Sequence, residues 1–187
     1  MIILPPVFDG LTDLAPATDR LDALVPAVAT ALRQWQGPAA ASEIIHAMTD
    51  PEWADTATFV EHYGGGLLEV SANCVVAAAK RGGETRYAAC LIPSATRADL
   101  NGAARKALDA RKVSFAPLSV VVETTGMEYG GVTPIGLPPH WPLLLDPSLL
   151  AIPHVLVGSG SRAGKLILPS KSLLDLPGAT PVPALAT

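Results

Sequence analysis

The sequence has few cysteines and few charged residues. Its two cysteines, Cys74 and Cys90, stand at neither C-x-x-C nor histidine-ligand spacing, which excludes a disulfide framework and a cysteine-based metal site. We expect both thiols to be buried. The chain has no run of about eighteen apolar residues, and its start carries neither the basic nor the apolar segment of a secretory signal. These absences predict a cytoplasmic protein that does not bind a membrane.

The chain also lacks an excess of positive charge. Its formal net charge is -4 and its pI about 5.5, so any RNA contact must be local or assisted by a partner. More than half of the Lys and Arg side chains nevertheless lie between residues 80 and 112. They include Lys80, Arg81, Arg97, Arg105, Lys106, Arg111 and Lys112. This group fits an RNA-facing patch and an ordinary solvated hairpin tip and helix face equally well.

The four histidines show no metal-binding pattern. His46, His62, His140 and His154 lack the i, i+4 spacing and the cysteine partners of a zinc site, so we predict no metal. The pair His140-Trp141 offers two flat rings that can stack on a base. A loop anchored by a buried tryptophan is the favoured interpretation of that pair.

The length and hydrophobic content of the chain suit a single domain. With 187 residues, 49% of them hydrophobic, the chain can bury a substantial core. We expect an irregular arm over residues 1–18, a single domain over 19–179 and a flexible tail over 180–187. Apolar residues at three-and-four spacing predict a helix that Pro26 divides and that ends by Gly37-Pro38. They are Leu21, Leu24, Val25, Val28, Leu32 and Trp35.

The rest of the chain contains segments with the apolar spacing of strands and segments with the apolar spacing of helices. A hairpin centred on Gly82-Gly83 would place Cys74 opposite Leu91, so that Cys74 and Cys90 face opposite sides of the sheet. The predicted strands are Ser42–Met48, Asn73–Ala79, Arg86–Ile92, Arg111–Phe115, Pro142–Asp146, His154–Val157 and Lys165–Leu168. The predicted helices run from Pro51 to residues 64–66, over Asp99–Asp109, and from Ser170 through Leu176. The strands should form one mixed sheet in an α+β fold.

The segment Pro117–Thr125 fits two structures. Its triplet of valines favours a strand by propensity. The spacing of Leu118, Val121 and Thr125 instead fits a helix, with Gly126 as the residue that ends it.

The loop that follows is the most informative part of the chain. Residues 125–136 contain four glycines and one proline, which specify a backbone shape rather than a core. Glycine lets amide N–H groups face a ligand, while Pro134 fixes its own φ and restricts Thr133. Such a loop favours a ligand-binding site, and the alternative is a tight connection between a helix and a strand.

This loop resembles that of the YbaK/EbsC family of aminoacyl-tRNA deacylases, whose G-x-x-x-P pattern matches Gly130 and Pro134. The resemblance extends from Ala54 to Ala179, with four more features in the family's order. They are the helix ending in Thr125-Gly126, the Pro142–Asp146 strand, the turn of residues 157–162 and the ending Leu173–Ala179. It favours a helix over Pro117–Thr125. It also implies a mixed, partly barrel-like sheet flanked by helices.

The resemblance implies an enzyme that hydrolyses the ester of a wrongly attached alanine, cysteine or serine on tRNA, with tRNA for proline as the expected carrier. Gly130 and Gly131 would supply N–H donors to the oxyanion, Thr133 would orient a hydroxyl, and Asn73 would hold the carbonyl or the ribose. The expected substrate-binding residues are Pro134, Gly136, Asp146, Gly158, Ser159 and Gly160. Aminoacyl-tRNA and a prolyl-tRNA synthetase are the implied partners, with no cofactor, no DNA, and a monomer or homodimer.

Asn73 departs from the family. Many members carry a lysine at the start of this strand, where the chain reads Asn73-Cys74-Val75. A neutral amide donates a weaker hydrogen bond than an ammonium group. Lys80 offers no evident replacement, because the hairpin places it at the turn. The departure keeps a second hypothesis open, a module that binds aminoacyl ends or a synthetase without cleavage.

Two other motifs are weaker. Residues 158–163 match the dinucleotide fingerprint G-x-G-x-x-A, but a strand follows where that fingerprint needs a helix. Ser159 and Ser161 lack the G-x-S-x-G elbow of a hydrolase nucleophile. A polar turn beside a ligand pocket explains residues 158–163, including the two serines, better than a nucleotide site or a catalytic serine does. The acidic pI leaves a third hypothesis, a small-molecule hydrolase or ligand binder built on the same pocket.

Overall fold

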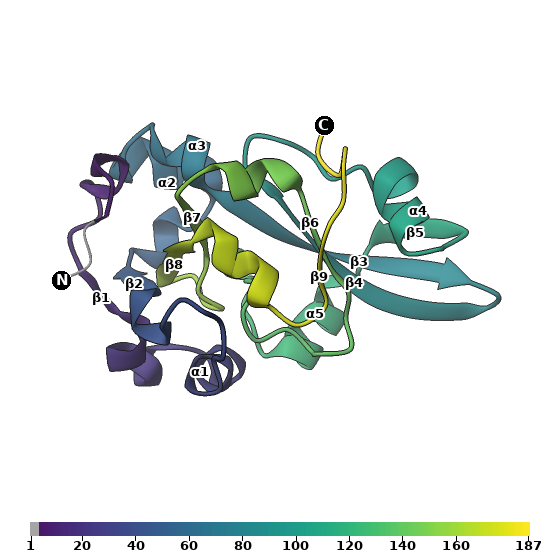
Figure 1. Ribbon diagram of the computed structural model, residues 1–187, viewed down its shortest axis with the longest axis horizontal. Coiled ribbons are helices and arrows are strands. Elements are labelled where there is room, and N and C mark those ends of the chain that lie inside the picture. Colours follow the sequence, from purple (N-terminus) through teal and green to yellow (C-terminus); the bar gives the residue numbers. More distant parts are fainter. Residues whose placement is uncertain (1–3) are drawn as a thin grey trace.

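The computed structural model describes residues 4–187, which form two β-sheets flanked by helices (Figure 1). The larger sheet has the strand order β5-β3-β4-β6-β9 and the smaller one β1-β2-β8-β7. In the described part of the chain the sheets stay open, without closure into a barrel. The predicted α+β class is confirmed.

The larger sheet is built on a long hairpin that extends to the right in Figure 1. Its strands are β3 (Ala72–Arg81), β4 (Glu84–Pro93), β5 (Lys112–Phe115), β6 (Leu143–Leu145) and β9 (Ala179–Pro181). Positive φ angles at Gly82 and Gly83 form the turn, and Cys74 pairs with Leu91 as predicted. β6 pairs in parallel with β4, and β9 pairs in parallel with β6, so this sheet is mixed.

The smaller sheet corrects the prediction of a single sheet. It contains β1 (Leu14–Pro16), β2 (Ile45–Met48), β7 (His154–Gly158) and β8 (Gly164–Pro169), all antiparallel. β7 and β8 were expected to extend the sheet of the hairpin, but β8 pairs with β2 instead. Periodicity identifies a strand and not its partner, which is why the division was missed. An isolated bridge between Ser71, just before β3, and Leu156 of β7 links the two sheets.

The main core lies between the sheets and includes Val28 and Leu32 of α1, Leu91 of β4 and Leu166 of β8. The helices are α1 (Pro26–Arg33), α2 (Thr56–Tyr63), α3 (Leu67–Val70), α4 (Arg105–Ala107) and α5 (Leu118–Thr125). Short 3-10 helices cover residues 6–8, 17–23, 41–43, 51–53, 147–151 and 170–175, and a π-helical turn covers 100–104. Pro26 opens α1, which confirms the predicted division there.

Two predicted helices are interrupted. After Asp50, whose carboxylate caps a 3-10 turn, the extended backbone of Asp55 separates that turn from α2. The helix predicted over Asp99–Asp109 begins with a π-helical turn capped by Asp99 before α4. α5 is the helix that the resemblance favoured, and Gly126 ends it in the left-handed conformation at φ 67°.

Both ends of the chain are more ordered than expected. In the arm assigned to residues 1–18, β1 pairs with β2 and Phe8 is buried, whereas residues 1–3 lie outside the described part. In the tail, Leu185 is buried, Val182 N–H donates to Leu145, and Thr187 exchanges backbone hydrogen bonds with Arg97. Small and proline-rich segments looked frayed in the sequence, but their few apolar side chains fill the edges of the core.

Candidate functional site

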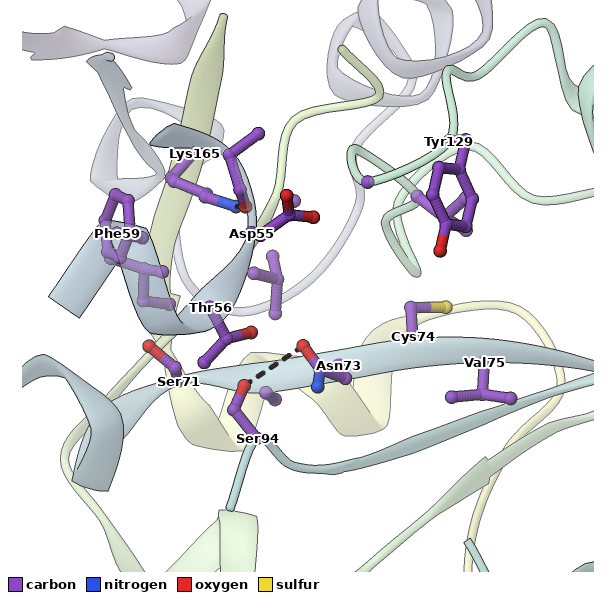
Figure 2. A pocket seen from close by; sticks show the side chains of 17 residues that line it. Asp55, Thr56, Phe59, Ser71, Asn73, Cys74, Val75, Ser94, Tyr129 and Lys165 are labelled. Atoms are coloured by element: carbon purple, nitrogen blue, oxygen red, sulfur yellow. Dashed lines mark hydrogen bonds between the residues drawn. The ribbon is translucent and has the colours of Figure 1, made fainter. Parts of the chain in front are cut away.

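A cavity of about 340 Å³ opens where the two sheets meet, beside the bridge of Ser71 and Leu156 (Figure 2). Five parts of the chain form it: the start of α2, the start of β3, the residue after β4, the glycine loop, and β7 with β8. Its lining includes Ala54, Asp55, Thr56, Phe59, Ala72, Asn73, Cys74, Val75, Ser94, Tyr129, Gly130, Val132, Val157, Gly158 and Lys165. The structure therefore brings Asn73, Gly130 and Gly158 together at one cavity.

The glycine loop leaves α5 through a defined cap. The Thr125 hydroxyl donates to the Val121 carbonyl at 2.7 Å and accepts the Met127 N–H at 3.1 Å. Met127 is buried, so it anchors the loop in the core before the chain reaches the cavity. These contacts fix where residues 128–132 begin.

The turn of residues 158–162 holds the other side of the loop. Glu128 N–H donates to the Gly160 carbonyl at 2.8 Å, and Gly160 N–H donates to the Gly131 carbonyl at 2.7 Å. The Glu128 carboxylate accepts the Arg162 N–H at 2.7 Å. The two segments lie so close that a Cβ at Gly158 would stand 2.4 Å from the Gly131 carbonyl oxygen. Only glycine fits there, because the conflict involves backbone on both sides.

The two glycines predicted to bind an oxyanion differ in their N–H groups. Gly131 N–H donates to the Glu128 carbonyl at 3.0 Å, so the loop itself uses this donor. Gly131 is also absent from the cavity wall. Gly130 lines the cavity at φ 83°, and its N–H forms no hydrogen bond within residues 4–187. Of these two glycines, Gly130 alone lies on the cavity wall with an N–H that has no partner among the described residues.

Asn73 lies at the start of β3, half-buried and opposite Ile92. Its amide oxygen accepts a hydrogen bond from the Ser94 hydroxyl at 3.1 Å, drawn as the dashed line in Figure 2. The hydrogen bond fixes the orientation of the amide and leaves the NH₂ group without a protein partner among the described residues. Asn73 is therefore a preset neutral donor at the cavity.

The sequence prediction missed Lys165, which enters the same cavity from β8. The residue is only 9% exposed, and its ammonium group donates to the Ala54 carbonyl at 3.1 Å and lies 5.1 Å from the centre of the Phe59 ring. Burial lowers the pKa of Lys165 to about 8, helped by nearby Arg162 and opposed by Asp55. A signal was present: a lysine within Lys165–Leu168, a strand buried on both faces, is rare without a partner.

Asp55 and Arg162 stand beside Lys165. The Asp55 side chain is 67% exposed and lies 3.8 Å from the Arg162 guanidinium, while Arg162 also donates to the Pro51 carbonyl at 3.1 Å. Arg162 thereby ties the turn after β7 to the segment before α2. Figure 2 shows Asp55 and Lys165 both turned toward the opening that Asn73 faces.

Cys74 lines the cavity without being a nucleophile. Burial raises the pKa of the Cys74 thiol far above its ordinary value, with a small contribution from Cys90. The thiolate is the reactive form of cysteine, so this side chain acts through its size. Both cysteines are free, as expected, although Cys74 is only half-buried.

Several predicted site residues lie elsewhere. Thr133 is fully buried, with no hydrogen-bond partner for its hydroxyl in the described chain, and is not part of the wall. Pro134 and Gly136 line a separate cavity of about 750 Å³ beside α1. Asp146 is structural, since its carboxylate caps the 3-10 turn at Ser148 and accepts the Ala186 N–H.

Two more residues support the turn rather than the wall. Ser159 is buried and donates to the Ser161 carbonyl at 3.3 Å, and Gly160 joins the turn to the loop. Lys80, at the far end of β3, is exposed near the hairpin turn as the sequence indicated. In the described residues no group of three or more His, Cys, Asp or Glu is placed to hold a metal ion. No described helix is both long and apolar enough to cross a membrane.

Comparisons with known proteins agree with this fold. No curated protein matches the chain. A crystal structure of a candidate trans-editing enzyme for prolyl-tRNA synthetase is similar at a TM-score of 0.69 and 24% identity, over 84% of this chain and 96% of that one. A hypothetical protein is similar at a TM-score of 0.63 and 23% identity, over 76% of this chain and 90% of that one.

A third structure, a candidate signal transduction protein from Marinobacter aquaeolei VT8, has a TM-score of 0.55 at 16% identity. The likeness covers 84% of this chain and 30% of that one. The family model of the aminoacyl-tRNA editing domain matches residues 50–176, which contain every residue described above on the cavity wall. By that match the chain belongs to the aminoacyl-tRNA editing domain family.

Proposed function

We propose that this protein is a free-standing deacylase that hydrolyses the ester between a wrongly attached small amino acid and tRNA. The observation that carries the proposal is the cavity at the junction of the sheets, because it combines an unpaired N–H of Gly130 with the preset amide of Asn73 inside the editing domain. We place the protein in the YbaK group of that family, on the G-x-x-x-P pattern from Gly130 to Pro134.

The chemistry asks little of acid or base groups. An aminoacyl ester is already activated, so positioning a water molecule and stabilising the developing oxyanion supply most of the required acceleration. The Gly130 N–H and the Asn73 NH₂ are two donors that the cavity offers to the acyl oxygen or the ribose. The proposed reaction uses no cofactor.

We propose alanine, cysteine or serine as the amino acid. The cavity wall is made largely of backbone and short side chains, among them Ala72, Cys74 and Gly158, and the close approach of backbone at Gly158 leaves it little room to expand. A rigid wall excludes larger side chains by steric conflict, whereas one additional methylene in a yielding pocket discriminates by only about 1–3 kcal/mol.

We propose tRNA for proline as the carrier, with a prolyl-tRNA synthetase as the source of the mischarged substrate. The support is the similarity to a structure described as a candidate trans-editing enzyme for that synthetase. The basic side chains of the hairpin tip would meet the RNA backbone. Lys80 and Lys112 face each other across β3 and β5, and Arg81 lies next to them with its charge partly matched by Asp109.

The experiment is deacylation of a panel of tRNAs charged with alanine, cysteine, serine or the cognate proline. We expect release of at least one of the three small amino acids and no release of proline. The Asn73→Ala variant should be slower than the native protein on the released amino acid. If none of the four esters is cleaved at high protein concentration, the enzyme proposal fails.

A second candidate function is a binding module that holds aminoacyl-tRNA without cleaving it. The neutral Asn73, already engaged by Ser94, favours this alternative. It predicts tRNA binding in the same panel with every ester intact, and weaker binding by the Asn73→Ala variant.

A further inference from the structure

Lys165 is a buried cation whose hydrogen bonds are incompletely used. An ammonium group has three donors, and in the described chain one of them reaches the Ala54 carbonyl. The Phe59 ring covers another side of the group. Lys165 is the one Lys or Arg side chain among the described residues of the cavity wall. Its remaining donors are therefore available to a ligand in that cavity.

A purely structural role explains Lys165 poorly. Burying an ammonium group costs free energy, and one hydrogen bond to a carbonyl with a ring contact offsets it only in part, as the lowered pKa of Lys165 records. An apolar side chain of similar length would fill the space beside Phe59 at lower cost. A cation kept under these conditions in a cavity is a candidate for ligand binding.

Asp55 adds the opposite charge beside it. Asp55 is the N-cap residue of α2, yet its carboxylate makes no capping hydrogen bond. Its ion pair with Arg162 is long, at 3.8 Å, and the side chain is largely exposed to the cavity mouth. The cavity thus presents a buried positive group, Lys165, close to a largely exposed negative group, Asp55 (Figure 2).

An aminoacyl ester carries the complementary pattern. Its α-ammonium group is positive, and its carbonyl oxygen becomes negative as water adds to the carbonyl carbon. We propose, resting on the deacylase function above, that Lys165 donates a hydrogen bond to the acyl carbonyl oxygen while Asp55 accepts one from the α-ammonium group. The pair would orient the ester so that the carbonyl carbon faces water.

The reaction balances without a change at either residue. The oxygen of water bonds to the carbonyl carbon, and the π electrons move to the carbonyl oxygen that Lys165 holds. Collapse of this intermediate breaks the bond to the ribose oxygen, which takes one proton of the attacking water, while the other proton passes to solvent as the carboxyl group ionises. The products are the free amino acid, the tRNA hydroxyl and one proton, while Lys165 keeps its own proton throughout. Stabilising such an oxyanion with one donor accelerates acyl transfer by about 10²–10³-fold.

The first test compares Lys165→Met with Lys171→Met, a matched control at an exposed lysine outside the cavity. With the mischarged tRNA that the native protein cleaves, Lys165→Met should lose about 100-fold in kcat/KM and Lys171→Met should lose nothing. Unchanged or higher thermal stability of Lys165→Met would show that the loss is not unfolding. Activity within about threefold of native would overturn the proposal.

The second test uses the pH dependence of activity to ask whether Lys165 acts in its charged form. Lys165→Arg keeps its charge at all pH values used, whereas native Lys165 loses its proton as pH rises through about 8. The ratio of native to Lys165→Arg activity should fall about tenfold between pH values of about 7 and 9. If the ratio stays constant, Lys165 does not act as a charged donor to the substrate and its role is structural alone.

The third test addresses Asp55. N-acetylation of the aminoacyl group removes its α-ammonium charge, so the native protein should cleave the acetylated ester at least about tenfold more slowly. Asp55→Asn should be slow on both substrates and should discriminate little between them. Full discrimination by Asp55→Asn would overturn the role of Asp55.

Binding separates this inference from the proposed function. A non-hydrolysable probe, adenosine carrying alanine in a 3′-amide linkage, can be titrated by calorimetry into native protein, Lys165→Met and Asp55→Asn. Binding that both variants weaken at least about tenfold supports the orientation even if no ester is cleaved. If the native protein and both variants cleave the ester at the same rate, the proposed orientation is refuted and the deacylase function stands. A native protein that neither binds nor cleaves overturns both.

Discussion

At the scale of single residues, the burial of Lys165 lowers the stability of the fold while it places a charged donor at the cavity. The folded pKa of about 8 lies below the ordinary value of 10.5, so between these values the unfolded chain binds more protons. The free energy of unfolding therefore rises with pH across that interval. Below pH 8 the full penalty of the buried charge is present, on the order of 3 kcal/mol.

Lys165→Met should remove this penalty. We expect the variant to be more stable than the native protein at a pH of about 7.5, with the difference shrinking toward a pH of about 10, because Met packs on Phe59 without a charge. Urea unfolding of both proteins at the two pH values measures it. A variant that is less stable at the lower pH would show that the hydrogen bond to Ala54 outweighs the cost of burial.

His46 makes the protein sensitive to acid. Neither of its ring nitrogens has a partner in the described chain, and burial lowers its pKa below 6.5, with Arg20 contributing and Asp13 opposing. Stability from the neutral form is present above pH 6.5 and is lost as pH falls through the folded pKa. His46→Leu should lose less stability than the native protein between pH values of about 7 and 5 in urea unfolding.

The matched control for this prediction is His140→Leu, since His140 is exposed. It should follow the native pH dependence. His154, whose pKa burial also lowers, will leave a smaller residual dependence in the His46 variant. Identical curves for native and His46→Leu proteins would contradict the assignment.

At the scale of elements, the glycine loop and the turn after β7 behave as one unit because their backbones touch. In Gly158→Ala the new Cβ would approach the carbonyl oxygens of Gly131 and Val132 to within 2.4 and 2.5 Å. Neither atom can rotate away as a side chain would. We expect a loss of at least about 2 kcal/mol in the free energy of unfolding.

Gly65→Ala is the control, since a Cβ there meets nothing within 4 Å. It should change stability by less than about 0.5 kcal/mol. Thermal unfolding of both variants compares them. Equal melting temperatures for the two would show that the loop and the turn can move apart.

The sequence predicts elements here better than it predicts their partners. The hairpin register followed from Gly82-Gly83, and the end of α5 followed from Gly126, because each depends on one local backbone preference. The pairing of β8 with β2 did not follow, since that contact joins segments far apart in the chain. The packed tail was missed for the same reason.

The same difference between local features and long-range contacts applies to the candidate site. The family resemblance pointed to Gly130, Gly158 and Asn73, and the structure places all three on the wall of one cavity. A lysine in the apolar strand β8 is unusual in the sequence, but the place of Lys165 at the cavity could not be predicted, since it depends on the second sheet. Gly131 and Thr133 lie in the right loop, but which N–H or hydroxyl is free depends on the partners that folding supplies.

At the scale of the whole molecule, basic side chains gather at one end of the larger sheet, away from the cavity. The protein is acidic overall, yet Lys80, Arg81, Arg111 and Lys112 gather at the tip of the hairpin, about 25 Å along β3 from Asn73. This separation predicts that RNA affinity and ester cleavage depend on different residues.

The double variant Lys80→Glu/Lys112→Glu should raise KM for mischarged tRNA several-fold and leave kcat unchanged. The dependence of KM on salt should also weaken, by about one unit of slope for each phosphate that the variant no longer neutralises. Kinetics at two salt concentrations check this, with Lys171→Glu as the control. A fall in kcat with KM unchanged would contradict the division.

If the cavity between the sheets holds the acyl group, a large side chain placed inside it should stop cleavage without releasing the tRNA. Cys74 lies on the wall and points into the opening in Figure 2. The measurement is single-turnover cleavage of the preferred mischarged tRNA by Cys74→Phe, together with its tRNA affinity. We predict cleavage reduced at least about 100-fold, because the ester can no longer reach its donors, with tRNA affinity within about threefold of native. Cleavage at the native rate by a folded Cys74→Phe protein would contradict this placement of the acyl group.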